Sequence, residues 1–311
     1  MWTGVSAINC LIMADESGVI VTLDGRRHSF DEPLLCADDL AALRGDGAFE
    51  TLLVRDGRAC LVELHLRRLA QSARMLELPE LDLPQWRAAI DAAAREWAGQ
   101  AGNEGREGAL RLIYSRGREG RAKPTAYVMV TELPGRIADV RQAGVAALTL
   151  NRGLSASGAE ATPWLLAGAK TLSYAVNMAA IRHATHRGAD DVVFVSSDGL
   201  VLEGPRSTVV IAVDSEDPSA SRPCLLTPPP WYPILRGTTQ QAIFEVARAA
   251  GYDCDYRALR PADLHSARGV WLVSSLTLAA RVHTLDGQRL ACSPLAAEFA
   301  ALVDRAVVSD R

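Results

Sequence analysis

Short apolar runs alternate with two amphipathic stretches in the first part of the chain. Runs rich in β-branched residues predict strands, and Asp24-Gly25 and Asp56-Gly57 are favoured turn dipeptides between them. These strands are expected at Val19 to Leu23, Phe49 to Val54, Ala59 to Val62, Leu110 to Tyr114 and Ala126 to Glu132. Apolar residues at helical spacing predict two helices, Glu63 to Leu78 and Pro84 to Trp97.

The pattern breaks at Leu133-Pro134-Gly135, where we place a domain boundary between residues 1–134 and 135–311. Residues 151–163 are rich in Gly, Ser and Ala and are expected to form an interdomain loop, a candidate lid. Helices are then predicted at Leu172 to Arg187, Thr238 to Ala250 and Leu295 to Val307, and strands at Val192 to Ser196, Leu200 to Val213 and Val270 to Ser274. The expected class is therefore α/β (α+β) with two domains.

Composition narrows the possible partners. A chain of 311 residues with 49% hydrophobic and 23% charged residues is typical of a globular protein with a well-filled core. The net charge is −4 and no basic stripe is interleaved with aromatic residues, so a nucleic-acid partner is not expected. No signal-peptide pattern or apolar run of membrane-spanning length is found, which predicts a cytoplasmic protein without a membrane partner.

Cysteine and histidine give no sign of a metal site. The six cysteines are far apart without a C-x-x-C pair, so free thiols are expected. His183 and His186 are three residues apart on a predicted helix, but no third ligand type stands near them. We therefore expect no metal.

Lys170 is the first candidate for chemistry. It follows Leu166-Ala167-Gly168-Ala169 at the edge of a predicted helix, where small and apolar neighbours favour desolvation. Desolvation lowers the pKa of a lysine and activates it for Schiff-base formation. Most lysines are solvated surface residues, and Lys170 considered without the other segments is also compatible with such a position.

Two further segments suggest anion and cation partners. Glu203 stands among apolar strand residues, where a buried carboxylate needs a cation such as a protonated pyridine nitrogen. An outward-facing strand carboxylate is the alternative. Gly237-Thr238-Thr239 begins a predicted helix, which suits a bound anion, although an ordinary helix cap explains it equally well.

Taken together in order, these segments resemble the class IV aminotransferases, the fold-type IV pyridoxal-phosphate enzymes. The resemblance covers nearly the whole chain. It is carried by Arg44-Gly45-Asp46-Gly47-Ala48-Phe49-Glu50-Thr51, His65-Leu66-Arg67-Arg68-Leu69, Gly168-Ala169-Lys170, Glu203-Gly204, Gly237-Thr238-Thr239 and Val273-Ser274-Ser275-Leu276. It implies a small N-terminal α/β domain, a larger C-terminal pseudo-barrel domain, the cofactor between them, and a homodimer.

The resemblance also assigns roles within the cofactor site. Lys170 would hold pyridoxal 5'-phosphate as a Schiff base and shuttle the proton, and Glu203 would pair with the pyridine nitrogen. Arg68 would grip the phosphate. The remaining phosphate ligands would be Thr238, Thr239 and Ser275. Departures from the family pattern, such as Thr208 where Asn is common and Arg281 where Pro is usual, leave the substrate contacts open.

The substrate is suggested by Arg111-Leu112-Ile113-Tyr114-Ser115-Arg116-Gly117. Its Ser-Arg-Gly resembles the lyase and D-amino acid branches of the family, which would place Arg116 on a substrate carboxylate with Arg111 on the same strand face as support. Arginines facing solvent on an edge strand are the alternative. The preferred function is 4-amino-4-deoxychorismate lyase, which gives 4-aminobenzoate and pyruvate. A D- or branched-chain amino acid aminotransferase is the second hypothesis, and a cofactor-binding protein without catalysis is the third.

Overall fold

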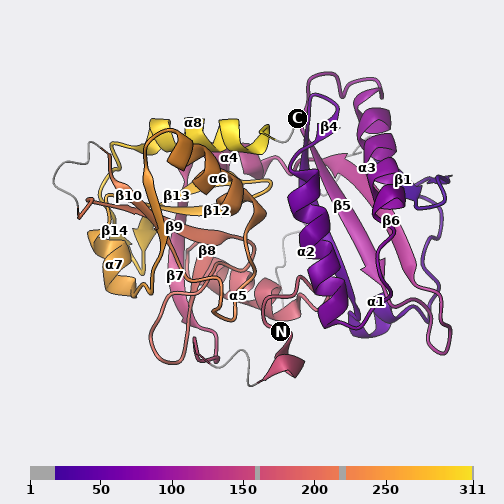
Figure 1. Cartoon of the computed structure of the whole chain (residues 1–311), viewed down its shortest axis with the longest axis horizontal. Helices are drawn as coiled ribbons and strands as arrows, with labels where there is room; N and C mark the ends of the chain where they lie inside the picture. Colours follow the sequence, from indigo (N-terminus) through magenta and orange to yellow (C-terminus); the bar gives the residue numbers. More distant parts are fainter. Residues whose placement is uncertain (1–17, 158–161, 217–221, 310–311) are drawn as a thin grey trace, which may run out of the picture.

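The computed structural model describes residues 18–157, 162–216 and 222–309, which form two β-sheets flanked by helices (Figure 1). The first sheet is antiparallel throughout, in the order β2-β1-β6-β5-β3-β4. Its strands are β1 (Val19–Thr22), β2 (Arg27–His28), β3 (Gly47–Arg55), β4 (Arg58–Ala59), β5 (Gly108–Ser115) and β6 (Thr125–Glu132).

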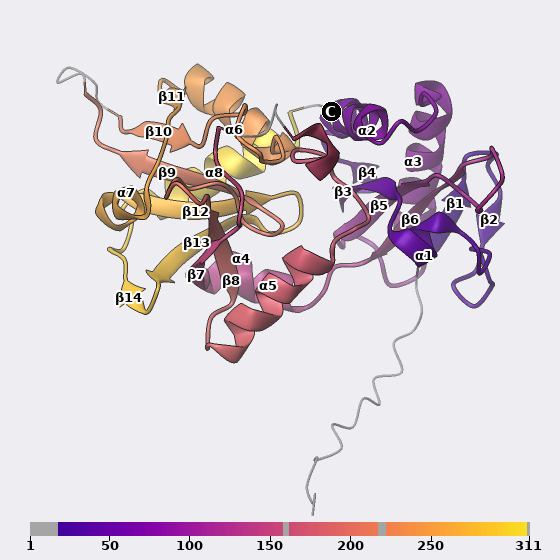
Figure 2. The same ribbon diagram turned by 90° about the horizontal axis from the view of Figure 1, so that it is seen from below.

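One face of this sheet is covered by helices α2 (Val62–Met75) and α3 (Leu83–Ala98), as Figures 1 and 2 show. Both helices begin and pack as their apolar stripes predict. Leu66 and Leu69 of α2 join Ile90 and Trp97 of α3 in a core with 1% exposure or less. The short helix α1 (Leu40–Arg44) precedes β3, and its Asp39 accepts a hydrogen bond from the backbone N–H of Ala41 as an N-cap.

The second sheet follows residue 144 and has the order β11-β10-β9-β12-β13-β7-β8, with β14 paired to β13. Its strands are β7 (Val145–Asn151), β8 (Asp191–Val195), β9 (Thr208–Val213), β10 (Cys224–Thr227), β11 (Asp253–Tyr256), β12 (Gly269–Ser274), β13 (Leu278–Leu285) and β14 (Gln288–Arg289). Its helices are α4 (Arg136–Ala143), α5 (Ala175–His186), α6 (Thr238–Ala249), α7 (Pro261–Ser266) and α8 (Ala296–Val307), with a 3-10 turn η1 (Pro163–Leu165).

Central strands of the second sheet are buried on both faces. In β9, Val210 and Ala212 pack in the cluster that contains α6 and α8, whereas Val209 and Ile211 belong to the cluster on the other face. The sequence of a strand that is covered on both faces is therefore a continuous apolar run, without the alternation of apolar and polar residues seen in a half-exposed strand. The predicted α/β architecture, with a small N-terminal unit and a larger C-terminal unit, is confirmed. The boundary at residue 134 stays a prediction.

Several predicted elements have different bounds. The strand expected over 200–213 is wrong in its first half, because the chain turns at residues 203–207 and only β9 is a strand. The helix expected from residue 172 begins at Ala175, since residues 170–172 pair with β3 instead. The strand expected over 59–62 is the two-residue β4, and α2 already begins at Val62. The predicted loop 151–163 starts at the end of β7, and its residues 158–161 lie outside the described residues.

The segment that carries Lys170 joins the two halves of the molecule. The Phe49 N–H donates to the carbonyl of Lys170 at 3.0 Å, and the Leu172 N–H donates to the carbonyl of Gly47 at 2.8 Å. The Lys170 N–H donates to the Ser72 hydroxyl of α2 at 3.0 Å. Because these bonds anchor the backbone on both sides of Lys170, its side chain has a fixed origin between the sheets.

Candidate active site

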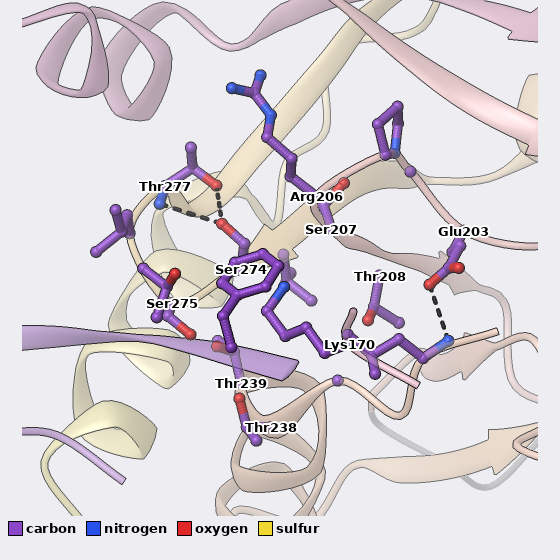
Figure 3. Close-up of a pocket in the computed structure, with 18 of the residues that line it drawn as sticks. Lys170, Glu203, Arg206, Ser207, Thr208, Thr238, Thr239, Ser274, Ser275 and Thr277 are labelled. Atoms are coloured by element: carbon purple, nitrogen blue, oxygen red, sulfur yellow. Dashed lines mark hydrogen bonds between the residues drawn. The ribbon is translucent and has the colours of Figure 1, made fainter. Parts of the chain in front are cut away.

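A cavity of about 310 Å³ lies where the two halves meet, within the size range of small-molecule sites (Figure 3). The first sheet contributes Phe49 and Arg111 to its wall. The second half contributes the turn at 203–207, the start of α6 and the end of β12. Seven of the eight residues predicted for the site line this one cavity: Arg68, Arg111, Lys170, Glu203, Thr238, Thr239 and Ser275.

Lys170 lies against aromatic rings rather than against a carboxylate. Its Nζ is 4.3 Å from the ring centroid of Phe49 and 5.5 Å from that of Tyr174. Burial, with a smaller contribution from the positive charge of Arg68, lowers the pKa of Lys170 to about 8. The lowered pKa increases the fraction of neutral amine at neutral pH to roughly one tenth, and the neutral amine is the form that attacks a carbonyl carbon.

Glu203 lies in a tight turn rather than in a strand. The Gly204 N–H donates to the carbonyl of Ser207 at 2.8 Å, and a Cβ on Gly204 would lie 2.2 Å from the Ser207 hydroxyl. The Leu235 N–H donates to Glu203 Oε2 at 3.0 Å, the contact drawn in Figure 3. Burial raises the pKa of Glu203 to about 7. A cation placed beside this carboxylate would restore its charge.

Glu203 is expected to make the cofactor-free protein less stable as the pH rises. Its pKa is about 7 in the folded state and near 4.5 when unfolded, so the folded state binds more protons between these values. We expect Glu203→Gln to raise the free energy of unfolding by about 1–3 kcal/mol at pH 8 and to leave it unchanged at pH 4. Urea titrations at the two pH values test this, and a difference of equal size at both would contradict it.

The start of α6 offers unpaired donors to an anion. Its N-cap is Gly237, which has no side chain to cap the first N–H groups. A Cβ at Gly237 would lie 2.2 Å from the Thr208 hydroxyl, so the close packing here requires glycine. Among the described residues, the buried hydroxyls of Thr239 and Ser207 have no hydrogen-bond partner. Both line the cavity, and a bound group with acceptor oxygens would satisfy them.

A buried charge network that the sequence did not reveal stands behind this anion cradle. Glu50 is fully buried on β3, and both of its oxygens accept hydrogen bonds from Arg68 at 2.7 Å. His65 Nδ1 also contacts Glu50 at 2.7 Å. Although burial opposes the charged form, Arg68 and His65 hold the pKa of Glu50 far below its usual range. A glutamate within an apolar strand was the available signal, as it was for Glu203.

His65 connects this network to the predicted anion ligands. Glu50 is a carboxylate and can only accept, so the proton of His65 is on Nδ1. Burial lowers the pKa of His65, which keeps the ring neutral and leaves Nε2 as an acceptor. Nε2 lies 3.2 Å from the Thr238 hydroxyl and 3.3 Å from the Ser275 hydroxyl. The ring therefore fixes the position of two cavity hydroxyls.

Arg68 reaches the cavity with two of its three nitrogens already engaged by Glu50. The third, Nη1, donates to the carbonyl of Arg236 at 2.8 Å. The predicted grip of Arg68 on a phosphate stays a prediction, but its position is fixed by a buried carboxylate and a backbone carbonyl.

The two arginines predicted for the substrate are separated. Arg111 lines the cavity and its Nη1 donates to the Thr131 hydroxyl at 3.2 Å. Arg116 is absent from the described lining and pairs with Asp46 at 2.6 Å, just beyond the end of β5. The expectation that both arginines share one strand face is wrong, because β5 ends at Ser115 and Arg116 is held by Asp46 and by the carbonyl of Leu76. Within one chain, Arg116 is therefore placed away from this cavity.

No group of three or more His, Cys, Asp or Glu suited to a metal occurs in the part of the chain that the structure describes. Over those same residues, no helix has the length and apolar character that a bilayer crossing requires. Five cysteines are free thiols, and Cys10 lies outside the described residues.

The comparisons with known proteins all indicate the same family. The model of "Amino-transferase class IV" matches residues 47–285. A bifunctional aminodeoxychorismate lyase/D-amino acid transaminase from Mycobacterium tuberculosis is 68% identical over 293 residues, covering 94% of this chain and all of that protein.

Solved structures agree with this result. A hypothetical aminotransferase from M. tuberculosis, in its PLP-bound form, is 67% identical with a TM-score of 0.90, covering 94% of this chain and 100% of that one. A fold IV transaminase from Curtobacterium pusillum is 39% identical with a TM-score of 0.86, covering 93% and 98%.

The cavity fits the cofactor on which this family depends, pyridoxal 5'-phosphate. It combines a lysine of lowered pKa, a carboxylate that lacks a cation, and a helix N-terminus with unpaired hydroxyls nearby. These groups match the aldehyde, the pyridine nitrogen and the phosphate of the cofactor in number and in chemical type.

Proposed function

Because this chain belongs to the class IV aminotransferase family, we propose that it is a pyridoxal-phosphate-dependent 4-amino-4-deoxychorismate lyase that also transaminates D-amino acids. The single observation that carries the pyridoxal-phosphate chemistry is the placement of Lys170 and Glu203 in one cavity; the two activities named for the M. tuberculosis relative support the choice of reaction. Lys170 has the lowered pKa of a Schiff-base lysine, and Glu203 is a carboxylate that needs a cation.

When bound, the cofactor supplies an electron sink for the charge that develops when a proton leaves the carbon beside the amine. Glu203 would hold the pyridine nitrogen protonated. Thr238, Thr239, Ser275 and Arg68 would hold the phosphate, with their positions fixed by the α6 N-terminus and the Glu50–His65 network. The rigid anchoring of the Lys170 backbone would keep Nζ within reach of the reacting carbon.

In the lyase reaction, Lys170 would accept the proton from the ring carbon that bears the amine. The carbon–oxygen bond to the enolpyruvyl group then breaks, and the leaving group takes up a proton, which Lys170 is placed to return. The ring becomes 4-aminobenzoate and the side chain becomes pyruvate, so atoms and electrons balance without an oxidant. Formation of the aromatic ring makes the elimination favourable.

Transamination is the second candidate activity, and the two activities named for the M. tuberculosis relative favour it. The opening proton transfer to Lys170 is shared between the reactions. The reactions differ in the later step, which is loss of a leaving group in the lyase reaction and transfer of the amino group in transamination, so Lys170 would serve as the proton carrier in both.

A paired assay tests the proposal. The purified enzyme loaded with pyridoxal phosphate is supplied with aminodeoxychorismate, and 4-aminobenzoate and pyruvate are measured together. Parallel reactions contain D-amino acids or branched-chain L-amino acids with 2-oxoglutarate. Equal amounts of aminobenzoate and pyruvate are expected. Keto acid and glutamate without aminobenzoate would keep the cofactor site and overturn the lyase assignment.

We further propose a homodimer, as the family resemblance implies. Large apolar side chains are exposed on α1, η1 and α5: Leu43, Trp164, Leu165, Val176 and Met178. These elements adjoin one another, because Arg44, Leu165 and Asn177 line a common depression. Exposed apolar side chains gathered on neighbouring elements are typical of an interface. Sedimentation equilibrium is expected to give twice the chain mass, whereas a monomer at micromolar concentration would contradict this.

A further inference from the structure

Two arginines of the cavity have no part in the cofactor chemistry. Arg136 is the first residue of α4, and Arg206 belongs to the turn at 203–207. Both line the same cavity as Lys170 although they are far apart in sequence. Figure 3 shows the Arg206 side chain extending away from Lys170. Arg136 is exposed and Arg206 is partly buried, as expected at the mouth of a pocket.

The positive charge of this pair is poorly compensated. Asp191 is 3.9 Å from Arg206, at the limit of an ion pair. Arg136 forms no ion pair with any residue in the described ranges. Partial burial of its guanidinium at the mouth of the pocket, followed by repulsion from Arg206, lowers the pKa of Arg136, and burial raises the pKa of Asp191. Two guanidinium groups thus share one distant carboxylate whose own charge is disfavoured.

The backbone adds to the attraction for an anion. The N-cap of α4 is Gly135, without a side-chain cap, and Pro134, Arg136 and Ile137 from this helix end all line the cavity. The Ile137 and Ala138 N–H groups already donate to the carbonyls of Pro134 and Gly135, so the attraction here comes from the helix dipole, which favours negative charge at a helix N-terminus. Apolar Ile137 and Leu276 form part of the same wall, which suits a ligand with carbon atoms between two charged ends.

We infer that Arg136 and Arg206 form a subsite for the second carboxylate of a dicarboxylic substrate, remote from the reacting amine. This inference rests on the proposed function for the reacting end, and it extends that function by naming the substrate class. Aminodeoxychorismate and glutamate both carry two carboxylates. A shared subsite for the second one would allow a single cavity to accept both, since paired guanidinium groups bind carboxylate with directional, charge-assisted hydrogen bonds.

The test measures binding without turnover. The probes are glutarate, which has two carboxylates, and pentanoate, which has one; neither carries an amine or a keto group. Dissociation constants for the pyridoxal-phosphate-loaded enzyme are measured by calorimetry. Glutarate is expected to bind about tenfold or more tightly than pentanoate. Arg136→Gln/Arg206→Gln is expected to remove this preference while changing pentanoate binding less than about twofold.

Two further variants make the assignment specific. Arg289→Gln, on exposed β14 and outside the cavity lining, is the matched control and should keep the preference. Arg111→Gln should weaken both probes alike. Equal binding of the probes by the wild-type enzyme would overturn the inference, as would loss of the preference in Arg111→Gln alone. Because no catalysis is required, these outcomes are independent of whether the lyase assay succeeds.

Discussion

Replacing Lys170 by alanine is expected to lower both activities of the loaded enzyme by about 10⁴-fold or more, because the reaction loses its covalent anchor and its proton carrier. Steady-state rates with aminodeoxychorismate and with D-amino acids measure the loss. Within the part of the chain that the structure describes, Nζ lies over the rings of Phe49 and Tyr174 and forms no ion pair, so its removal should leave the fold intact.

The chain offers a matched control for this substitution. Its only other lysine is Lys123, which is exposed between β5 and β6. Lys123→Ala should keep both activities within about twofold of wild type, as expected for a surface change. Residual activity of Lys170→Ala above one-hundredth of wild type would show that another group moves the proton.

Replacing Glu50 by glutamine is expected to lower the free energy of unfolding by about 3–5 kcal/mol, because Arg68 and His65 would be left with a buried charge and a buried donor unpaired. Urea titration of the cofactor-free protein measures the loss. We also expect weaker binding of pyridoxal phosphate, since His65 would no longer be held in the tautomer that positions Thr238 and Ser275.

Glu63→Gln is the matched control for the buried network. It removes an acid that pairs with Arg87 across two helices, but both side chains are about two-fifths exposed. Exposed pairs contribute little, so stability should be nearly unchanged. A Glu50→Gln protein as stable as Glu63→Gln would show that the Glu50 network is not needed for the fold.

The sequence predicted the elements whose patterns are local. The stripes of α2 and α3 and the strands β3 and β5 follow directly from apolar spacing. The strands that were missed, such as β10, β11 and β13, are short or interrupted, and their pairing depends on partners far along the chain. Residues 203–207 were taken for strand because their close Gly204–Ser207 turn is a property of packing rather than of alternation.

The candidate site likewise contains residues that a local sequence pattern indicates and residues that only tertiary packing identifies. Lys170 and Glu203 could be selected because a lysine or glutamate among apolar residues demands an explanation. Glu50 carried the same signal, but its role depends on His65 and Arg68, which only the packing of α2 on β3 brings to it. Arg136 and Arg206 had no distinguishing pattern, since their importance comes from sharing one cavity.

The identity of the covalent anchor is the most direct test of this account. The wild-type protein is incubated with pyridoxal phosphate and reduced with borohydride, and its peptides are mapped by mass spectrometry. With only two lysines in the chain, the two possible lysine products are easily distinguished. The account predicts stoichiometric labelling of the peptide with Lys170 and none of that with Lys123. An unlabelled Lys170 peptide, or equal labelling of both, would contradict it.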